Sequence, residues 1–136
     1  MDIGHAKLDR DAPERFHTLR AALGVTSFGI NEMLLRPGQR GRIHRHHRQE
    51  EVYLVLQGML TLVVEQEERD FGPDELVRVA PEVRRQLVNR GSETLILLAL
   101  GGYGEHESRD GEAFTSWDQE KGAPPKDVPL PDDLPV

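Results

Sequence analysis

Residues 38–58 read GQRGRIHRHHRQEEVYLVLQG and hold the most informative pattern in the chain. In an extended strand, side chains two residues apart share a face. His44 and His46 therefore point the same way, so both imidazoles can reach one ion, whereas His47 points away. A carboxylate after the next turn, at the start of a neighbouring antiparallel strand, would complete a two-histidine, one-carboxylate set that leaves coordination positions open.

Glu50 and Glu51 can both supply that carboxylate. A strand face that begins at Glu51 continues through Tyr53, and one that begins at Glu50 continues through Val52 and Leu54. Both faces are mostly apolar further along, as a packed strand requires. Apolarity alone therefore leaves the choice between the two carboxylates open.

On both sides of this stretch, short apolar runs alternate with glycine, proline and charged turns, which is the pattern of strands. The expected strands are 27–35, 42–46, 51–57, 59–65, 75–79, 85–88 and 94–100, with a turn at 65–68. This regular spacing predicts an all-β antiparallel sandwich or barrel. Residues 52–56 and 95–98 are apolar on both faces, although a strand in an isolated small barrel needs only one buried face. The second apolar face predicts a homodimer.

The two ends of the chain differ from this body. A short helix is expected over 11–24, where Asp11 can cap, Pro13 suits the first turn and Gly24 can end the helix. From Glu105 to the end, nine acidic residues face three basic ones, and five of the nine prolines fall in the last fourteen residues. This end is expected to be an extended or disordered acidic tail, with Phe114 and Trp117 as anchors. The predicted division is an N-terminal arm with a short helix (1–25), a β-barrel (26–104) and an acidic, proline-rich tail (105–136).

The composition is that of one globular domain, with 136 residues of which 37% are hydrophobic and 30% charged. The chain has no cysteine, which excludes disulfides and thiolate zinc sites and leaves nitrogen and oxygen as the only metal ligands. The net charge of −7 argues against a nucleic-acid partner. No secretory signal begins the chain, and the longest apolar run, Leu95 to Leu100, is too short to span a bilayer. We therefore expect a cytoplasmic protein with no membrane contact.

The segment around the histidines resembles the first conserved motif of the cupin superfamily. That motif is a glycine, five residues, His-x-His, three or four residues, a glutamate, six residues and a glycine, and the matching positions are Gly38, His44, His46, Glu51 and Gly58. The resemblance selects Glu51 over Glu50, because only Glu51 stands six residues before Gly58. It spans roughly residues 26–101 and implies a single antiparallel double-stranded β-helix, the jelly-roll or cupin barrel of small single-domain members.

The second cupin motif is only partly present. Residues 72–74 resemble its opening and residues 89–91 resemble its close, but the histidine that usually supplies a fourth ligand between them is missing. Counting forward through the motif puts Gln86 in its place, whereas counting back from the end puts Arg85 there. A glutamine oxygen can bind a hard cation, whereas an arginine repels one.

The resemblance implies a divalent metal ion on His44, His46 and Glu51, with Gln86 as the fourth ligand. It does not distinguish Fe(II), Mn(II), Zn(II), Ni(II) and Cu(II). Cupins with such sites include dioxygenases, isomerases, epimerases and decarboxylases, and other cupins have lost the metal and only bind small ligands. We therefore expect a metal-binding cupin that takes a small oxygen-bearing molecule, as a dioxygenase or isomerase. The alternative is a non-catalytic small-molecule sensor.

Five arginines and three histidines lie between residues 36 and 48 without one acid, which suits an anionic ligand at the mouth of the site. The candidates for contact with this small molecule are Arg42, Tyr53 and Arg85. No residue is assigned a catalytic role from the sequence.

Overall fold

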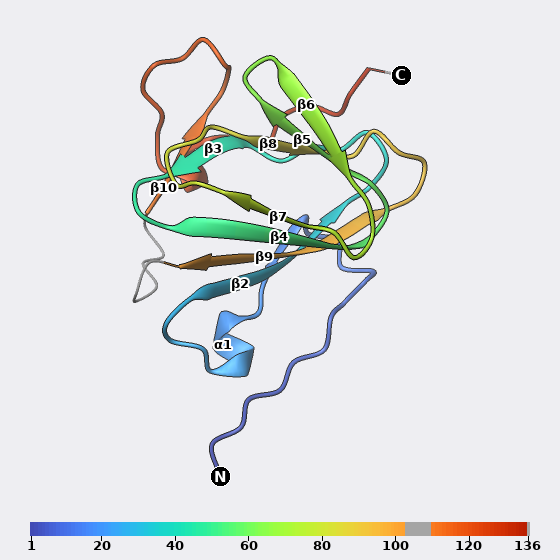
Figure 1. The fold of residues 1–136 in the computed structure, drawn as a ribbon, viewed down its shortest axis with the longest axis vertical. Coiled ribbons are helices and arrows are strands. Elements are labelled where there is room, and N and C mark those ends of the chain that lie inside the picture. The colour runs from blue at the N-terminus through green and yellow to red at the C-terminus, as the bar shows by residue number, and fades with distance from the viewer. Residues whose placement is uncertain (103–109, 136) are drawn as a thin grey trace.

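The computed structural model describes residues 1–102 and 110–135 (Figure 1). Its elements are β1 (Phe16–Thr18), α1 (Arg20–Leu23), β2 (Gly29–Leu35), β3 (Ile43–His46), β4 (Glu50–Gln57), β5 (Leu60–Val64), β6 (Glu67–Phe71), β7 (Leu76–Val79), β8 (Gln86–Val88), β9 (Leu95–Gly102), β10 (Gly111–Phe114) and the 3-10 helix η1 (Pro125–Asp127). The prediction of an all-β protein is confirmed, since all but two of these elements are strands.

The strands form two facing layers. One is a five-stranded antiparallel sheet in the order β1-β2-β9-β4-β7, and the other combines the sheets β6-β5-β8 and β10-β3. Bridges from Arg40 to Val88 and from His44 to Arg85 join β3 to β8. Figure 1 shows β3, β8 and β5 above β7, β4, β9 and β2, and the main core lies between them.

Side chains of the central strands alternate between this core and the outer face of the five-stranded sheet. On β4, Tyr53 and Val55 are buried in the core, whereas Val52 and Leu54 point outward and are half-buried. Glu51 lies on the inner face, because it is two residues from Tyr53 on the same strand. The prediction that this strand is apolar on both faces is confirmed, and its inner face carries one carboxylate.

The helix predicted over 11–24 is wrong for most of its length. Only Arg20–Leu23 is helical, and Phe16–Thr18 is an edge strand that pairs with β2. The free edge of β2 offers a row of backbone hydrogen-bond partners, and pairing with them outweighs the local signals for a helix. The predicted stop at Gly24 is confirmed, since Gly24 adopts φ 77° and donates its N–H to the carbonyls of Arg20 and Ala21 in α1.

The predicted turn at 65–68 is also too long, because β6 begins at Glu67 and pairs with β5. Its sequence, EERDF, is almost entirely charged and gave no apolar strand signal. None of the helices in the described part of the chain has the length and apolar character needed to span a bilayer.

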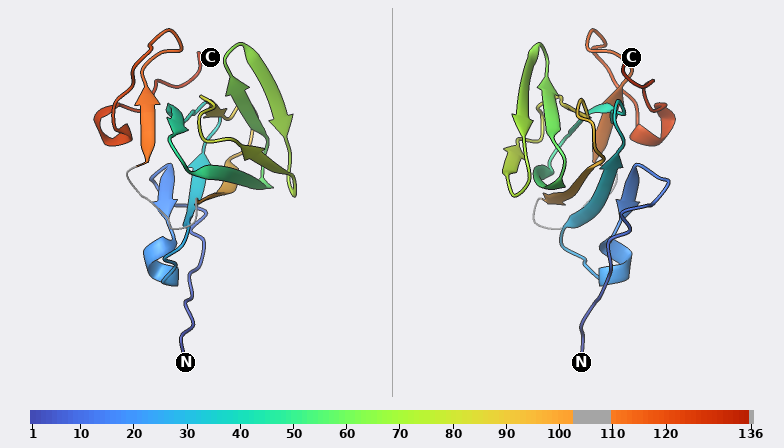
Figure 2. Two further views of the ribbon diagram at one scale, coloured as in Figure 1. Left: turned by 60° about the vertical axis from the view of Figure 1, so that its left-hand side comes forward. Right: turned by 90° about the vertical axis from the view of Figure 1, so that its right-hand side faces the viewer.

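The C-terminal segment, which we define as residues 110–135, is more ordered than the sequence predicts. Its β10 strand pairs with β3, and Phe114, only 2% exposed, is an anchor as predicted. Figure 2 shows this segment wrapped against the barrel body, while the N-terminus extends away on the side of α1. The division into arm, barrel and tail stays a prediction, and the part of the predicted tail from 105 to 109 lies outside the described residues.

Candidate metal centre

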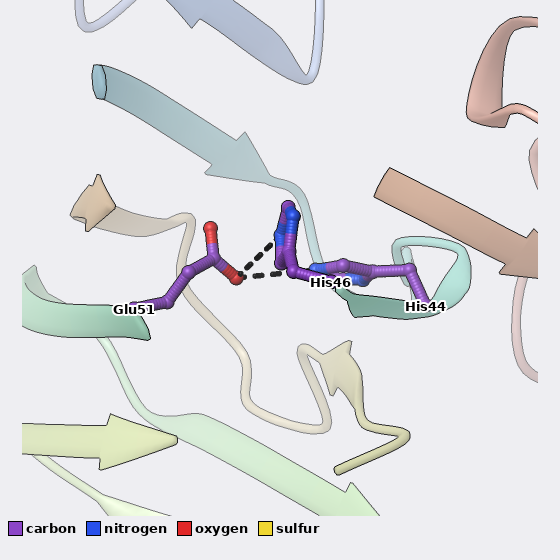
Figure 3. A group of neighbouring side chains, drawn as sticks. All are labelled: His44, His46 and Glu51. Atoms are coloured by element: carbon purple, nitrogen blue, oxygen red, sulfur yellow. Dashed lines mark hydrogen bonds and ion pairs between the residues drawn. The ribbon is translucent and has the colours of Figure 1, made fainter. Parts of the chain in front are cut away.

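Strands β3 and β4 bring the three predicted ligands together, as Figure 3 shows. The Nε2 atoms of His44 and His46 each lie 3.3 Å from Oε1 of Glu51. One possible ligand atom from each of the three residues lies within 4.8 Å of the ligand atoms of the other two. The two imidazole rings meet edge to face, with centroids 5.4 Å apart. The His-x-His alternation and the motif spacing therefore predicted this group correctly.

The surroundings of the two histidines leave ring nitrogens available to an ion. Nδ1 of His44 lies 3.2 Å from the carbonyl oxygen of Arg42, which can accept a hydrogen bond from it, and Nε2 lies on the side of Glu51. Both ring nitrogens of His46 are buried and make no hydrogen bond to the residues that the structure describes. A buried nitrogen without a hydrogen bond, directed at two other donor atoms, is the arrangement expected of a metal ligand.

Glu51 is held as a carboxylate. Burial raises the pKa of Glu51, but the nearby imidazoles of His44 and His46 outweigh burial and hold this pKa well below its usual range. The hydroxyl of Tyr53 donates to Oε1 of Glu51 at 2.7 Å. Burial, followed by the negative charge of Glu51, raises the pKa of Tyr53 well above its usual value, so this hydroxyl stays a neutral donor. Tyr53 therefore belongs to the site, as a partner of the carboxylate.

The fourth position is taken by Arg85, which is completely buried. One terminal nitrogen lies 2.5 Å from Oε1 of Glu51 and Nε lies 3.2 Å from the Tyr53 hydroxyl. The other terminal nitrogen donates to the carbonyls of Pro81 and Val83 at 3.2 and 2.8 Å. Burial opposes the guanidinium charge, but Tyr53 and Glu51 outweigh it and raise the pKa of Arg85. The site therefore contains a fixed positive charge.

Gln86 does not lie at the ligand group, which corrects the prediction that it completes the set. Its amide nitrogen donates to the carbonyl of Gly41 at 3.0 Å. Leu87 packs in the core, and because alternate residues share a strand face, Arg85 points inward with Leu87 while Gln86 points to the other face. The count back from the end of the motif is the one that the structure follows.

Arg42 contacts the C-terminal segment in the structure. Its Nε donates to the carbonyl of Val128 at 2.6 Å, in the C-terminal segment. Several other arginines hold the same segment: Arg40 donates to the Asp132 carbonyl, Arg45 to the Glu112 carboxylate, and Arg84 to the Gln119 carbonyl. The arginine-rich stretch thus has a structural role, and substrate contact by Arg42 stays a prediction.

One residue beside the site was missed by the sequence reasoning. Asp110 is buried and accepts backbone N–H groups from His47, Arg48 and Gln49, and its Oδ2 lies 3.7 Å from Nδ1 of His46. It contacts residues more than sixty positions earlier, so no local pattern identifies it.

The donor set of two imidazole nitrogens and one carboxylate oxygen fits a divalent first-row metal ion. His44, His46 and Glu51 would hold it. Compared with a histidine as the fourth ligand, Arg85 adds no lone pair and places a positive charge beside the Glu51 carboxylate, which lowers the attraction for a cation. The group is therefore a three-residue site in which Arg85 already balances part of the negative charge of Glu51.

Comparisons with known proteins agree with the observed fold. The family model described as a cupin domain matches residues 31–101. A cupin protein from Bacteroides fragilis has a TM-score of 0.67 and 19% identity, over 75% of this chain and 85% of that one. A protein from Silicibacter pomeroyi, described as a sugar phosphate isomerase from a cupin superfamily, has a TM-score of 0.64 and 28% identity, over 87% of this chain and 76% of that one.

A third solved structure, a cupin 2 conserved barrel domain protein from Salinispora arenicola, has a TM-score of 0.64 and 21% identity. It is matched over 74% of this chain and 89% of that one. No curated protein matches the sequence. With the family model covering more than half of the chain and the fold shared with these structures, the chain belongs to the cupin family.

Proposed function

We propose that this cupin domain binds a divalent metal ion and isomerises a small, anionic hydroxy-carbonyl compound, of which a sugar phosphate is the leading example. The observation that carries the metal is the convergence of His44, His46 and Glu51 within 4.8 Å. The reaction class is supported by the 28% identity to the Silicibacter pomeroyi protein described as a sugar phosphate isomerase. Among the chemistries open to such a site, this favours isomerisation over dioxygenation.

The chain's own residues keep the site in one geometry. Tyr53 and Arg85 both donate to Oε1 of Glu51, so the carboxylate is ionised and cannot rotate freely. The Arg42 carbonyl holds the ring of His44. A bound ion would polarise a carbonyl or hydroxyl oxygen of the substrate as a Lewis acid. Because the polar groups are fixed before the substrate arrives, little reorganisation is needed during the reaction.

The second candidate is a metal-free cupin that binds a small molecule without transforming it, and Arg85 favours it. The guanidinium already neutralises Glu51 from inside the protein, which in other sites is a task of the metal. Such a protein would serve as a sensor or carrier. Metal content separates the two candidates.

We expect the protein, after reconstitution with Fe(II), Mn(II), Ni(II) or Zn(II), to hold close to one metal ion per chain. A His44→Ala, His46→Ala double variant should lose it, since one carboxylate alone binds such ions weakly. His47→Ala is the matched control, because His47 is exposed and points away from the site. Elemental analysis and calorimetric titration make the measurement. A wild-type protein that takes up none of these ions would exclude the first candidate and leave the second.

Isomerase activity is tested directly by NMR in deuterium oxide. The metal-loaded protein is expected to exchange the proton on the carbon next to the carbonyl in at least one member of a panel of phosphorylated aldoses and ketoses, because isomerisation moves that proton. The double variant provides the control. Binding of a panel member without exchange or product would favour the sensor.

We also propose that two copies pair through the outer face of the five-stranded sheet. Val52 lies opposite Leu100 and Leu54 opposite Leu98, all half-buried, while Leu76, the neighbour of Leu54 on β7, is 63% exposed. At the rim of this aliphatic patch, Glu50 and Arg78 form an exposed ion pair. A second copy related by a two-fold axis offers aliphatic residues to the patch and opposite charges to its rim, so the face is complementary to itself.

A Leu76→Asp substitution is therefore expected to weaken the dimer by about 10- to 100-fold, because it places a charge in the apolar centre of the contact. Light scattering after size-exclusion chromatography over a range of concentrations measures the effect. Met59→Asp, an exposed apolar position outside the patch, should leave the dimer intact. A wild-type chain that is monomeric at every concentration would contradict the pairing.

A further inference from the structure

We propose that Asp110 is a positioning residue that holds His46 and the turn after it in the geometry that the metal centre needs. The proposal rests on the proposed metal site, and it assigns part of that site to the C-terminal segment. It concerns the only carboxylate that, among the described residues, forms an ion pair with Nδ1 of His46.

The first contact is with the turn that separates the ligands. His46 ends β3 and Glu51 stands near the start of β4, so the path from 47 to 49 fixes how far apart these two ligands lie. Oδ2 of Asp110 accepts the N–H groups of all three residues of that path, at 3.1, 2.9 and 2.8 Å. Three successive N–H groups directed at one oxygen hold a turn in a single conformation.

The second contact is with His46 itself. The ring presents Nε2 to Glu51 and Nδ1 to Oδ2 of Asp110, at 3.3 and 3.7 Å. At 3.7 Å the second contact is electrostatic and not a hydrogen bond, and it raises the share of the tautomer with the proton on Nδ1 against the Glu51 carboxylate, which attracts a proton to Nε2. In that tautomer the lone pair is on Nε2, where a metal ion would bind. Carboxylates behind metal-binding imidazoles act in this way.

The third observation is that Asp110 is itself fixed. Its side chain is 4% exposed, and the next residue, Gly111, is the strand partner of His46 at the start of β10. The backbone approaches closely there, since a Cβ atom on Gly111 would lie 3.1 Å from Pro125 and 3.8 Å from the His46 ring. The C-terminal segment therefore packs directly behind a ligand, and Asp110 carries its charge to that point.

The test compares Asp110→Asn with wild type. Asparagine has nearly the same shape and its amide oxygen still accepts backbone N–H groups, but the charge facing His46 is lost. We expect the variant to fold and to bind Zn(II) or Mn(II) about 10- to 100-fold more weakly, as for other groups that orient metal ligands. Asp127→Asn is the control, since Asp127 is an exposed carboxylate of the same segment. Calorimetry measures the affinity and circular dichroism checks the fold.

A second measurement does not depend on metal. The ¹⁵N shifts of the His46 ring in the metal-free protein report its tautomer, and we expect the share of the Nδ1-protonated form to be larger in wild type than in Asp110→Asn. A change in both measurements supports the positioning role. Unchanged shifts would overturn it, and so would a normal metal affinity. If wild type binds no metal, the proposed function fails, and the ring shifts still decide whether Asp110 positions His46. Should Asp110→Asn not fold, Asp110→Ser is measured in the same way.

Discussion

Replacing Arg85 with methionine is expected to lower the free energy of unfolding by about 3–5 kcal/mol, the usual cost of removing one partner of a buried ion pair. The substitution keeps much of the side-chain volume but leaves the Glu51 carboxylate beside the core without the guanidinium that lies 2.5 Å from it. The carbonyl of Val83 loses its Arg85 donor as well, and the carbonyl of Pro81 keeps only the N–H of His46. Urea unfolding followed by circular dichroism measures the change.

The chain offers a matched control in its other arginine–glutamate pairs. Arg78 and Glu50 form an ion pair whose side chains are 60% and 48% exposed, so Arg78→Met should change stability little. Adding Glu51→Gln to Arg85→Met should recover part of the loss, because the unpaired charge is then removed. If Arg85→Met costs no more than Arg78→Met, the buried pair does not have the role that its burial indicates.

A chain that ends at Gly104 is expected to lose its cooperative fold or to aggregate. This truncation removes β10 and with it the four residue pairs along β3, and it exposes the edge of a strand that carries two candidate ligands. It also removes the buried side chains of Ala113, Phe114 and Val128. Removing a buried phenylalanine side chain alone costs about 3–5 kcal/mol, out of a total stability of about 5–15 kcal/mol for a typical domain.

Truncation after Leu130 is the control for this experiment. It keeps β10 and Val128 and removes three contacts at the surface: the Asp132 carbonyl with Arg40, the Asp133 carboxylate with Arg15, and the Leu134 N–H with Gly38. This shorter change should lower the melting temperature by a few degrees only. Equal melting temperatures for wild type and the chain ending at Gly104 would show that the C-terminal segment adds nothing to the fold.

The sequence predicted the metal-capable group well, because two local rules identify it. Strand alternation places His44 and His46 on one face, and the spacing to Gly58 selects Glu51. The identity of the fourth residue depends on where one position is missing between Pro81 and Asn89, which a count along the chain cannot decide. Pairing with β3 decides it in the fold, since Arg85 bridges His44.

The predictions that failed concern segments whose structure is set by distant partners. Residues 16–18 lie in the stretch that local signals predict as a helix. They form an edge strand instead, because they pair with β2, and only the folded sheet provides that partner. The strand at residues 111–114 is short, and its partner strand lies far earlier in the chain. The role of Asp110 is hidden for the same reason. Local patterns therefore predict the central strands and the ligands, and they miss what packs against them from the ends of the chain.

The pairing of β10 with β3 also bears on the order in which the molecule is made. Synthesis on the ribosome proceeds from the N-terminus, and early parts of a chain start to fold before later parts exist. The strand that carries His44 and His46 emerges well before β10, its outer neighbour in the sheet. Newly made chains therefore expose this histidine-bearing edge until β10 has also been made, and during that interval the edge is open to mispairing and to premature capture of metal ions.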